Sequence, residues 1–392
     1  MHTKRLMRIL MVVVLALSMT GVGLAQNIPV TPKHKSDGSK FRVAYIQGGP
    51  YFEYDQVFLA VILQLRRLGW LESVNIPSRY TKDAKGIYEF LSTNDKVSKY
   101  LTFVPNAFYD SNWQDDLRLA NKRKLIERFQ KKDLDIIFAL GTWAGQDMKN
   151  MPPEFDIPAV VMDVSDALKA EIVDSNEDSG RDNLTARVDP LRYQRQIAMF
   201  HDIIGFAKLG MAFEDTVEGR SYAAITDVET MAAERGFEIE KELHLGYVKS
   251  KEKVEDWLLR AIKRLSPKID AFYITQQLAI DQKSLPKYLE VLNSRGIPTF
   301  SQTGSVKVRN GVLLSIATSG FKYVAEYHAK KIARILNGAQ PRSLPILFED
   351  PAKIAINLKT CQAIGFDPPV DILGAADEIF TCLLYTSPSP RD

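Results

Sequence analysis

The chain has 392 residues, of which 45% are hydrophobic and 25% are charged, and its formal net charge at pH 7 is +3. Three of the basic residues, Lys4, Arg5 and Arg8, lie in a segment that we expect to be removed, which leaves the remaining chain close to neutral. Nucleic-acid binding requires a basic face, so we expect no nucleic-acid partner. The length is sufficient for two α/β domains.

Residues 1–25 have the three parts of a secretory signal peptide: a basic start, an apolar run from Ile9 to Leu17, and small residues up to Ala25. The apolar run is shorter than the ~20 residues that a membrane-spanning helix needs. No cysteine follows the expected cleavage point, so we expect export to the periplasm without a lipid anchor. Residues 26–40 are polar and are predicted to form a flexible leader.

Residues 382–392 show neither a helical nor a strand period. Back-translated in one reading frame, this segment resembles a transposon-based sequencing adapter, and we interpret it as a sequencing artefact. We expect the natural gene to continue differently after about Thr381. Without Cys382, Cys361 is the one remaining cysteine, so we predict a buried structural thiol and no disulfide.

Short apolar runs alternate with helical patterns between these two ends. The runs predicted as strands are 43–46, 101–104, 135–140, 158–164, 183–188, 209–214, 238–243, 270–275, 298–301 and 311–317. Helices are predicted at 57–69, 253–265 and 285–296. Residues 73–99 are polar and predict an irregular excursion between the first helix and the second strand. Buried strands that alternate with helices are typical of parallel sheets covered on both faces.

A second strand–helix series begins after residue 189, which indicates a crossover between two similar lobes. The predicted fold class is therefore α/β, with two doubly wound parallel-sheet lobes. We expect the first lobe to comprise residues 41–190 and 320–339, and the second to comprise residues 191–319 and 340–381. Ligands of open parallel sheets bind beyond the carboxyl ends of the strands, so we expect those loops to line one cleft.

No sequence pattern for catalysis, metal binding or a cofactor is visible. HExxH, GxSxG, P-loop and GxGxxG motifs are absent from the sequence, and His201, His244 and His328 do not share helical spacing. His328 falls on the inward stripe of a helical pattern, which favours a packed histidine. We therefore expect a protein that is not an enzyme and that has no metal and no cofactor.

The stretch AYIQGGPYFEYD, residues 44–55, follows the first predicted strand. Two glycines and a proline would suit a phosphate cradle, whereas three aromatic residues would suit the wall of a pocket for an organic ligand. A phosphate cradle needs Lys, Ser or Thr near the glycines, and here aromatic residues follow them. We therefore predict that Gly48 and Gly49 form a strand-to-helix loop where the backbone approaches an organic ligand.

The segment INLKTCQAIGFDPPVDILGAADEIF, residues 356–380, resembles the C-terminal signature of a family of periplasmic ABC-transporter substrate-binding proteins. LGTWAGQDMKN, DIPAVVMDVSDA and DSGRDNLTARVDPLRYQRQI resemble further motifs of that family, and the likeness extends over nearly all of 41–380. The resemblance, to tryptophan/tyrosine-uptake-like receptors, implies a type I periplasmic binding protein architecture with a three-strand hinge. It also implies a small organic solute, often an amino acid, and an inner-membrane ABC permease as partner.

By position, the resemblance implies ligand-binding residues in both lobes. They are Gln47, Gly48, Tyr51, Thr142, Trp143, Asp163 and Asp166 in the first lobe, and Glu214, Asp215, Thr275, Gln276, Ser301, Thr318 and Ser319 in the second. Trp143 either lines the pocket or packs under a helix, and Asp166 either contacts the solute or caps a helix. Glu214 and Asp215 are neighbours, so only one of them can face the site from an extended chain.

The chain departs from the family at two positions. Thr275 and Gln276 stand where the family often has an acidic residue, and Gly320 stands where it often has Asp. The usual partner of a ligand ammonium group is therefore in doubt. We predict a monomeric periplasmic receptor that captures a small, amino-acid-like or aromatic solute for an ABC importer. A sensory protein for a membrane kinase or chemoreceptor, and a periplasmic enzyme on the same scaffold, remain the alternatives.

Overall fold

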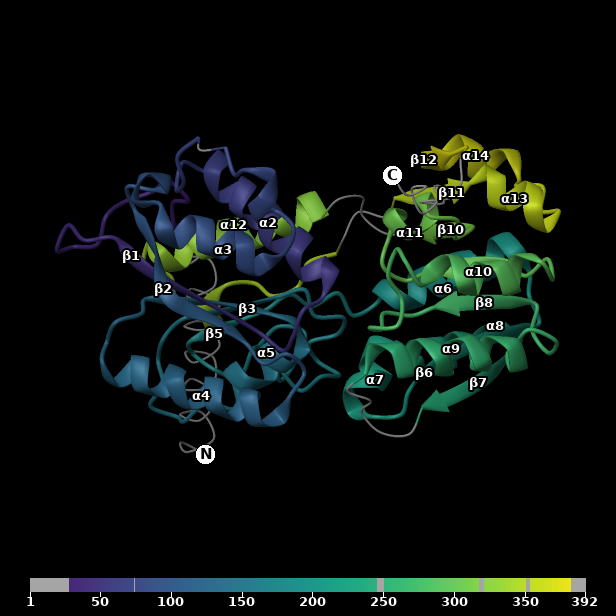
Figure 1. Ribbon diagram of the computed structural model, residues 1–392, viewed down its shortest axis with the longest axis horizontal. Coiled ribbons are helices and arrows are strands. Elements are labelled where there is room, and N and C mark those ends of the chain that lie inside the picture. Colours follow the sequence, from purple (N-terminus) through teal and green to yellow (C-terminus); the bar gives the residue numbers. More distant parts are fainter. Residues whose placement is uncertain (1–27, 74, 245–249, 317–320, 350–352, 382–392) are drawn as a thin grey trace, which may run out of the picture. The chain divides into compact units, whose positions relative to one another are not determined.

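The computed structural model describes residues 28–73, 75–244, 250–316, 321–349 and 353–381 (Figure 1). The signal peptide predicted at 1–25 and the adapter-like segment at 382–392 lie outside the described residues. Among the described residues, every helix is too short or too polar to cross a membrane.

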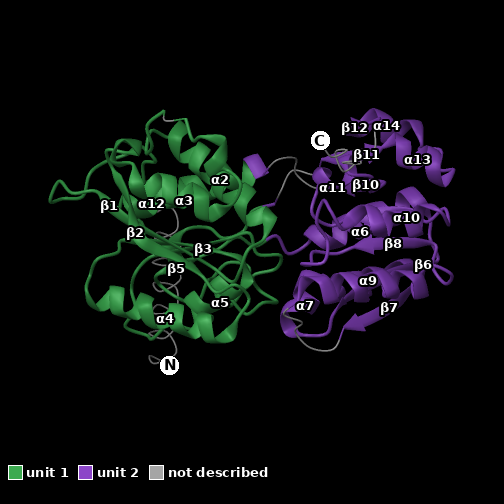
Figure 2. Ribbon diagram, in the orientation of Figure 1, with its two compact units in different colours: residues 1–188, 323–348 green, residues 189–322, 349–392 purple. Residues whose placement is uncertain are grey.

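The chain divides into two compact units, shown in Figure 2. Unit 1 comprises residues 1–188 and 323–348, and unit 2 comprises residues 189–322 and 349–392. The chain therefore passes between the units three times.

The third passage differs from the expectation, which placed residues 340–348 in the second lobe. Ile346 joins the hydrophobic core of unit 1. Leu347 forms a parallel bridge with Val188, and the backbone N–H of Val188 donates to Ile346 O at 2.8 Å. These contacts hold the segment in unit 1.

Unit 1 is built on a five-stranded parallel sheet with the order β2-β1-β3-β4-β5. Its strands are β1 Phe41–Gln47, β2 Leu101–Asp110, β3 Ile136–Leu140, β4 Ala159–Met162 and β5 Leu184–Thr185. Its α-helices are α2 Phe52–Arg67, α3 Ala84–Thr93, α4 Asp115–Gln130, α5 Gly141–Lys149 and α12 Lys322–Leu336, with short 3-10 helices η1 Ser78–Tyr80, η2 Asp95–Val97 and η4 Pro341–Ser343. Figure 1 shows α2, α3 and α12 on one side of the sheet and α4 and α5 on the other. Every residue of β3 is buried, as expected for a parallel strand covered on both faces.

Unit 2 contains a seven-stranded sheet with the order β12-β11-β10-β9-β8-β6-β7. Its strands are β6 Lys208–Glu214, β7 Glu238–His244, β8 Ala271–Ile274, β9 Thr299–Ser301, β10 Leu314–Ile316, β11 Ile354–Asn357 and β12 Ala376–Phe380. Its helices are α6 Arg192–Ile204, α7 Val217–Tyr222, α8 Ile225–Arg235, α9 Lys251–Leu265, α10 Leu285–Asn293, α11 Ser305–Arg309, α13 Leu358–Ile364 and α14 Val370–Ala375. The pair β10–β11 is antiparallel, whereas the other pairs are parallel.

The irregular excursion predicted at 73–99 is wrong, because this segment contains α3. The Asp83 side chain caps the helix by accepting from Gly86 N at 2.7 Å. Ile87, Tyr88 and Leu91 are buried, and the Tyr88 hydroxyl donates to Val43 O at 2.9 Å. A short apolar stripe with helical spacing therefore anchors α3 against β1.

β2 continues well beyond the strand predicted at 101–104. Pairing with β1 is interrupted after Phe103, where Pro105 lacks an N–H and Asn106 adopts a φ of 61°. Pairing resumes when Tyr45 meets Phe108, so β2 ends at Asp110. This bulge decides which residues reach the carboxyl edge of the sheet.

Two side chains outside that edge follow the sequence expectation. Cys361 is a buried free thiol, and its burial raises its pKa to about 11. His328 is fully buried on α12, which confirms a packed histidine.

Candidate functional site

Four strands of unit 1 end in one row. Gln47, at the end of β1, is in register with Asp110 of β2 and with Leu140 of β3, and Leu140 is in register with Met162 of β4. The loops that follow these four residues therefore start side by side at the carboxyl edge of the sheet. This is the edge at which open α/β sheets bind ligands.

Gln47 links the carboxyl ends of β1 and β2 by a side-chain hydrogen bond. Its Oε1 accepts from the Tyr45 hydroxyl at 2.7 Å, and its Nε2 donates to Asp110 Oδ2 at 3.1 Å. The other oxygen of Asp110 accepts from Asn112 N at 2.7 Å. The buried Gln47 amide therefore positions the end of β2 and the turn that follows it.

That turn places Trp113 against the glycine loop. Trp113 N donates to Gly48 O at 2.8 Å, and its indole Nε1 donates to Pro50 O at 3.3 Å. Asn112 and Trp113 have φ values of 46° and 57°, in the left-handed region. A bulky residue there is an outlier that costs about 1–3 kcal/mol and persists only when its surroundings hold it.

Gly49 is required by the indole of Trp113, and Gly48 is required by Trp113 and Trp143 together. A Cβ at Gly49 would lie 2.5–2.6 Å from three atoms of the Trp113 pyrrole ring, and a Cβ at Gly48 would lie 2.8 Å from Cβ of Trp143 and 2.9 Å from Cζ3 of Trp113. The near-equal distances place Gly49 over one face of the indole. The glycines predicted for close approach to a ligand therefore allow close approach of a tryptophan.

Trp143, on α5, packs against Trp113 and is 8% exposed. The two indoles meet edge to face, with centroids 5.6 Å apart and an interplanar angle of 78°. The guanidinium of Arg118 covers the Trp143 ring at 4.6 Å from its centroid. Trp143 is thus a packed side chain in this structure, and contact with a solute remains a prediction.

Arg118, on α4, also fastens α5. Its Nε lies 2.9 Å and 3.0 Å from the two carboxylate oxygens of Asp147, and its Nη2 donates to Trp143 O at 3.2 Å. Burial raises the pKa of the Asp147 carboxyl, and the charge of Arg118 opposes that rise. Arg118 therefore stabilises the charged form of the buried Asp147 carboxyl.

Further aromatic side chains extend the row. The ring centroids of Tyr51 and Tyr54 lie 5.1 Å apart, and those of Tyr54 and Trp113 lie 6.4 Å apart. Gly141 has a φ of 84°, and a Cβ there would collide with the Tyr54 hydroxyl. Tyr51 and Thr142 are both buried. The edge therefore carries a continuous aromatic layer that runs from the start of α2 to the start of α5.

The two predicted aspartates follow β4. Asp163 adopts a φ of 53° directly after the strand. Asp166 Oδ1 accepts from Leu168 N at 3.1 Å and from Lys169 N at 3.0 Å. Asp166 therefore caps a local turn at 167–171, where the sequence predicted either a helix cap or a solute contact, and contact with a solute remains a prediction.

Carboxylates give this edge a negative character. Burial raises the pKa of the Tyr45 hydroxyl well above its usual value, and the charges of Asp55, Asp110 and Asp163 raise it further. Burial also raises the pKa of Asp55 to about 6, although Asp55 accepts from Ala84 N at 2.7 Å. Among the described residues, no group of three or more His, Cys, Asp or Glu side chains could hold a metal ion.

The carboxyl edge of unit 2 holds the other predicted residues. Burial raises the pKa of Glu214, at the end of β6, and the adjacent Asp215 pairs with Arg220 at 3.0 Å. Thr275 is buried, and its hydroxyl accepts from Gln277 Nε2 at 2.9 Å. Thr318 and Ser319 lie outside the described residues.

Gln302 organises the loops after β8 and β9. Its Oε1 accepts from Gln276 N at 2.9 Å, and its backbone N–H donates to Ile274 O at 3.2 Å. Ser301 is fully buried, and its hydroxyl accepts from Thr303 N at 3.3 Å. Ser301 and Thr275 therefore support these loops, whereas Gln276 is half-buried beside them.

Trp113, Arg118 and Gln302 were not predicted from the sequence. Trp113 follows a strand that appeared to end at residue 104, and an extension through Pro105 has no sequence signal of its own. Gln302 follows the predicted strand 298–301 directly. The expectation that loops beyond the carboxyl ends of parallel strands line the ligand site applies to Gln302 and would have found it.

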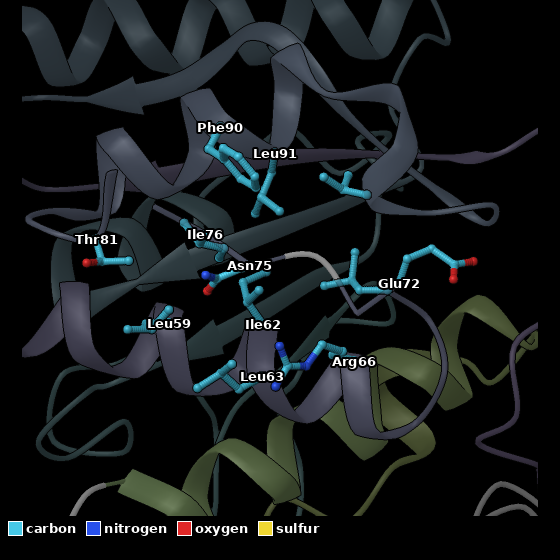
Figure 3. Close-up of a pocket in the computed structure, with 12 residues that line it drawn as sticks. Leu59, Ile62, Leu63, Arg66, Glu72, Asn75, Ile76, Thr81, Phe90 and Leu91 are labelled. Atoms are coloured by element: carbon cyan, nitrogen blue, oxygen red, sulfur yellow. The ribbon is translucent and has the colours of Figure 1, made fainter. Parts of the chain in front are cut away.

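One pocket of about 180 Å³ lies elsewhere in unit 1, between α2 and α3 (Figure 3). Leu59, Ile62 and Leu63 of α2 face Phe90 and Leu91 of α3 across it. None of its lining residues belongs to the loops that follow β1, β2, β3 or β4. The pocket is therefore separate from the carboxyl edge.

Residues 74–380 match the model of the family described as ABC transporter substrate binding protein. No curated protein sequence is significantly similar to the chain.

Solved structures share the fold. A domain from Streptococcus pneumoniae in complex with L-Trp is 17% identical, with a TM-score of 0.66 over 87% of this chain and 100% of that chain. A conserved domain protein from Vibrio cholerae is 17% identical, with a TM-score of 0.65 and the same coverage. A ligand-free, open substrate-binding protein with adhesive properties from Clostridium difficile is 17% identical, with a TM-score of 0.58 over 87% and 100%. The architecture is that of type I periplasmic binding proteins, as predicted.

Proposed function

The chain belongs to the ABC transporter substrate-binding proteins, a family of binding proteins and not of enzymes, and we propose that it is the periplasmic receptor of an importer. In this role it captures a small organic solute and delivers it to an inner-membrane permease. The observation that carries the proposal is the row of four strand ends in unit 1, from which the glycine loop and the aromatic layer project. Open α/β sheets bind small ligands at this edge.

The side chains at this edge suit an organic molecule better than a bare anion. Aromatic rings supply flat apolar area, and the nearby carboxylates of Asp110 and Asp163 disfavour phosphate. L-Trp in one structural neighbour and benzoate in a more distant one, 13% identical, have planar apolar bodies that are compatible with the aromatic part of such a surface. We propose a solute of this size with an apolar or planar body.

The first experiment identifies the solute. The protein without its signal peptide is purified without denaturation, and mass spectrometry is applied to the small molecules released by unfolding. The released compound should rebind in titration calorimetry with 1:1 stoichiometry. Absence of a bound compound, together with no binding of L-Trp or benzoate, would count against a receptor for such solutes.

The second experiment tests transport. Deletion of the gene should abolish uptake of the identified compound and should leave other uptake systems unchanged. Cell fractionation of the full-length chain should place the processed protein in the periplasm as a monomer. If uptake persists while a cellular response to the compound is lost, the sensory alternative replaces the importer.

A further inference from the structure

We propose that the indole of Trp113, and not that of Trp143, is the surface on which a planar solute stacks at the carboxyl edge of unit 1. The inference rests on the proposed function, because it names the class of solute that the same edge accepts. It is carried by the geometry of the Trp113 ring and by its immediate neighbours.

The glycine loop covers one face of the Trp113 ring. Gly49 lies over one face of the Trp113 pyrrole ring, and Gly48 lies against its benzene ring. Trp143 meets the indole at an interplanar angle of 78°, so it does not stack on the opposite face. Tyr54 is tilted by 43° at 6.4 Å. Trp113 nevertheless remains half-buried. Since the glycine loop covers one face of the ring, we infer that a solute would meet the opposite face.

Trp113 is held in place both at its backbone and at its indole. The backbone N–H and the indole Nε1 of Trp113 both donate to oxygens of the glycine loop, those of Gly48 and Pro50. A ring held at both ends loses little conformational freedom when a solute binds. The left-handed backbone of Trp113 is the kind of outlier that accumulates at ligand sites. The chain thus maintains a strained turn in order to present this ring.

Trp113 and Trp143 differ in burial, since Trp113 is half-buried and Trp143 is buried. Trp143 is 8% exposed, and Arg118 covers its ring. It therefore supports the edge of Trp113 and has little area left for a solute. A flat solute makes full contact with a flat indole, whereas a puckered ring of equal charge makes less. The class of solute is therefore a compound with a planar, conjugated body.

The first test compares planar and puckered probes in calorimetry. The pairs are benzoate against cyclohexanecarboxylate, and L-phenylalanine against L-cyclohexylalanine, so that both anionic and zwitterionic ends are covered. We expect the planar member to bind at least ~10-fold more tightly in the pair that binds. Equal or tighter binding of the puckered member overturns the inference, as does a failure of all four probes. A different compound released from the purified protein would leave the receptor function intact in either case.

The second test uses variants and the planar probe that binds. Trp113→Ala should weaken its binding by roughly 30-fold. Gly49→Ala should weaken it similarly, because the new Cβ would lie 2.5 Å from the indole and would displace it. Gly374→Ala is the control, since a Cβ there has open space. Unchanged affinity in Trp113→Ala or in Gly49→Ala overturns the inference.

A spectroscopic signature separates contact from support. The chain has four tryptophans, and Trp70 is fully buried. Probe binding should change the tryptophan emission of the wild-type protein. Trp113→Phe should remove most of that change and keep the affinity within about 5-fold, since a planar ring remains. Persistence of the full emission change in Trp113→Phe would assign the contact to another tryptophan.

Discussion

The guanidinium of Arg118 lies over the indole of Trp143, 4.6 Å from the ring centroid, and joins α4 to α5 through this contact. The same guanidinium pairs with the buried carboxylate of Asp147 at 2.9 Å. Arg118 therefore contacts both the Trp143 ring and the Asp147 carboxylate, which lie one helical turn apart on α5. This arrangement explains why a tryptophan at a loop-to-helix junction is buried.

Trp143→Ala is accordingly expected to destabilise the empty protein. Removal of a buried tryptophan leaves a cavity, and the expected loss is about 3 kcal/mol of unfolding free energy. Urea unfolding with an unchanged m-value measures this loss, and Trp143→Phe should lose less. A variant that keeps its stability but loses solute binding would show that Trp143 lines the site.

Arg118→Met should destabilise the protein in a pH-dependent way. Removal of the cation leaves Asp147 buried with Lys122 Nζ at 3.9 Å, and breaking a buried pair typically costs about 3 kcal/mol. The folded-state pKa of Asp147 would then rise further above its unfolded value. The folded state would bind more protons than the unfolded state, so the loss should grow as the pH rises from about 4 to about 7.

Urea unfolding of the wild-type protein and Arg118→Met at both pH values tests this sign. Arg123→Met is the matched control, because Arg123 is exposed on the same helix. An equal loss at both pH values would mean that Arg118 acts through packing alone.

The alternation of buried strands and helices was sufficient to predict two α/β units. β1, β3 and β8 begin and end within two residues of the predicted runs, since buried parallel strands are apolar along their whole length. α3 was missed because its apolar stripe, Ile87, Tyr88 and Leu91, is short and lies within a polar segment. β11 was not predicted from the sequence, because its antiparallel pairing with β10 is set by tertiary contacts and has no local sequence pattern.

The candidate site was only partly predictable for a related reason. A carboxyl edge can be predicted only when the end of each strand is known. Gln47 and Thr142 were placed correctly beside strand ends. Trp113 was not predicted, because the second half of β2, which precedes it, was not predicted. The interruption at Pro105 is compensated by pairing of Tyr45 with Phe108, which depends on the neighbouring strand. Trp143 is more buried than Trp113, and this burial is likewise set by a side chain from another helix, that of Arg118.

Asp55 should make stability fall as the pH rises through the mildly acidic range. Its folded-state pKa is about 6, raised from 3.8 by burial. Between these values the folded state binds more protons than the unfolded state, so stability is lost as the pH rises. Asp55→Asn keeps an oxygen for Ala84 N and removes the titration, so it should be more stable than the wild type near pH 7.

Unfolding measurements at about pH 4 and about pH 7 should show a smaller difference for Asp55→Asn than for the wild type. Asp116→Asn is the control, because Asp116 is exposed in the first turn of α4. If Asp55→Asn keeps the wild-type difference between the two pH values, Asp55 is ionised in the fold over the whole range.

Lys331 should contribute the opposite slope at alkaline pH. It is 2% exposed on α12, and its Nζ donates to Thr185 Oγ1 at 2.8 Å and to Ala186 O at 2.7 Å. Burial holds its pKa well below the usual 10.5, with a smaller contribution from the charge of Arg334. Above its folded-state pKa, the unfolded chain binds more protons than the folded one, so stability should rise as the pH approaches 10.5. The neutral amine still donates its hydrogen bonds, whereas Lys331→Met cannot.

The free energy of unfolding of the wild type should therefore increase from about pH 7 to about pH 9.5 relative to that of Lys331→Met. Lys330→Met, which removes a partly exposed neighbour paired with Glu326 at 2.7 Å, should keep the wild-type slope. The residues that Lys331 holds, Thr185 and Ala186, precede the first passage of the chain into unit 2. Hydrogen exchange of Val188 N, which donates to Ile346 O, should therefore accelerate in Lys331→Met and not in Lys330→Met. Equal protection in both variants would show that the passage is fixed without Lys331.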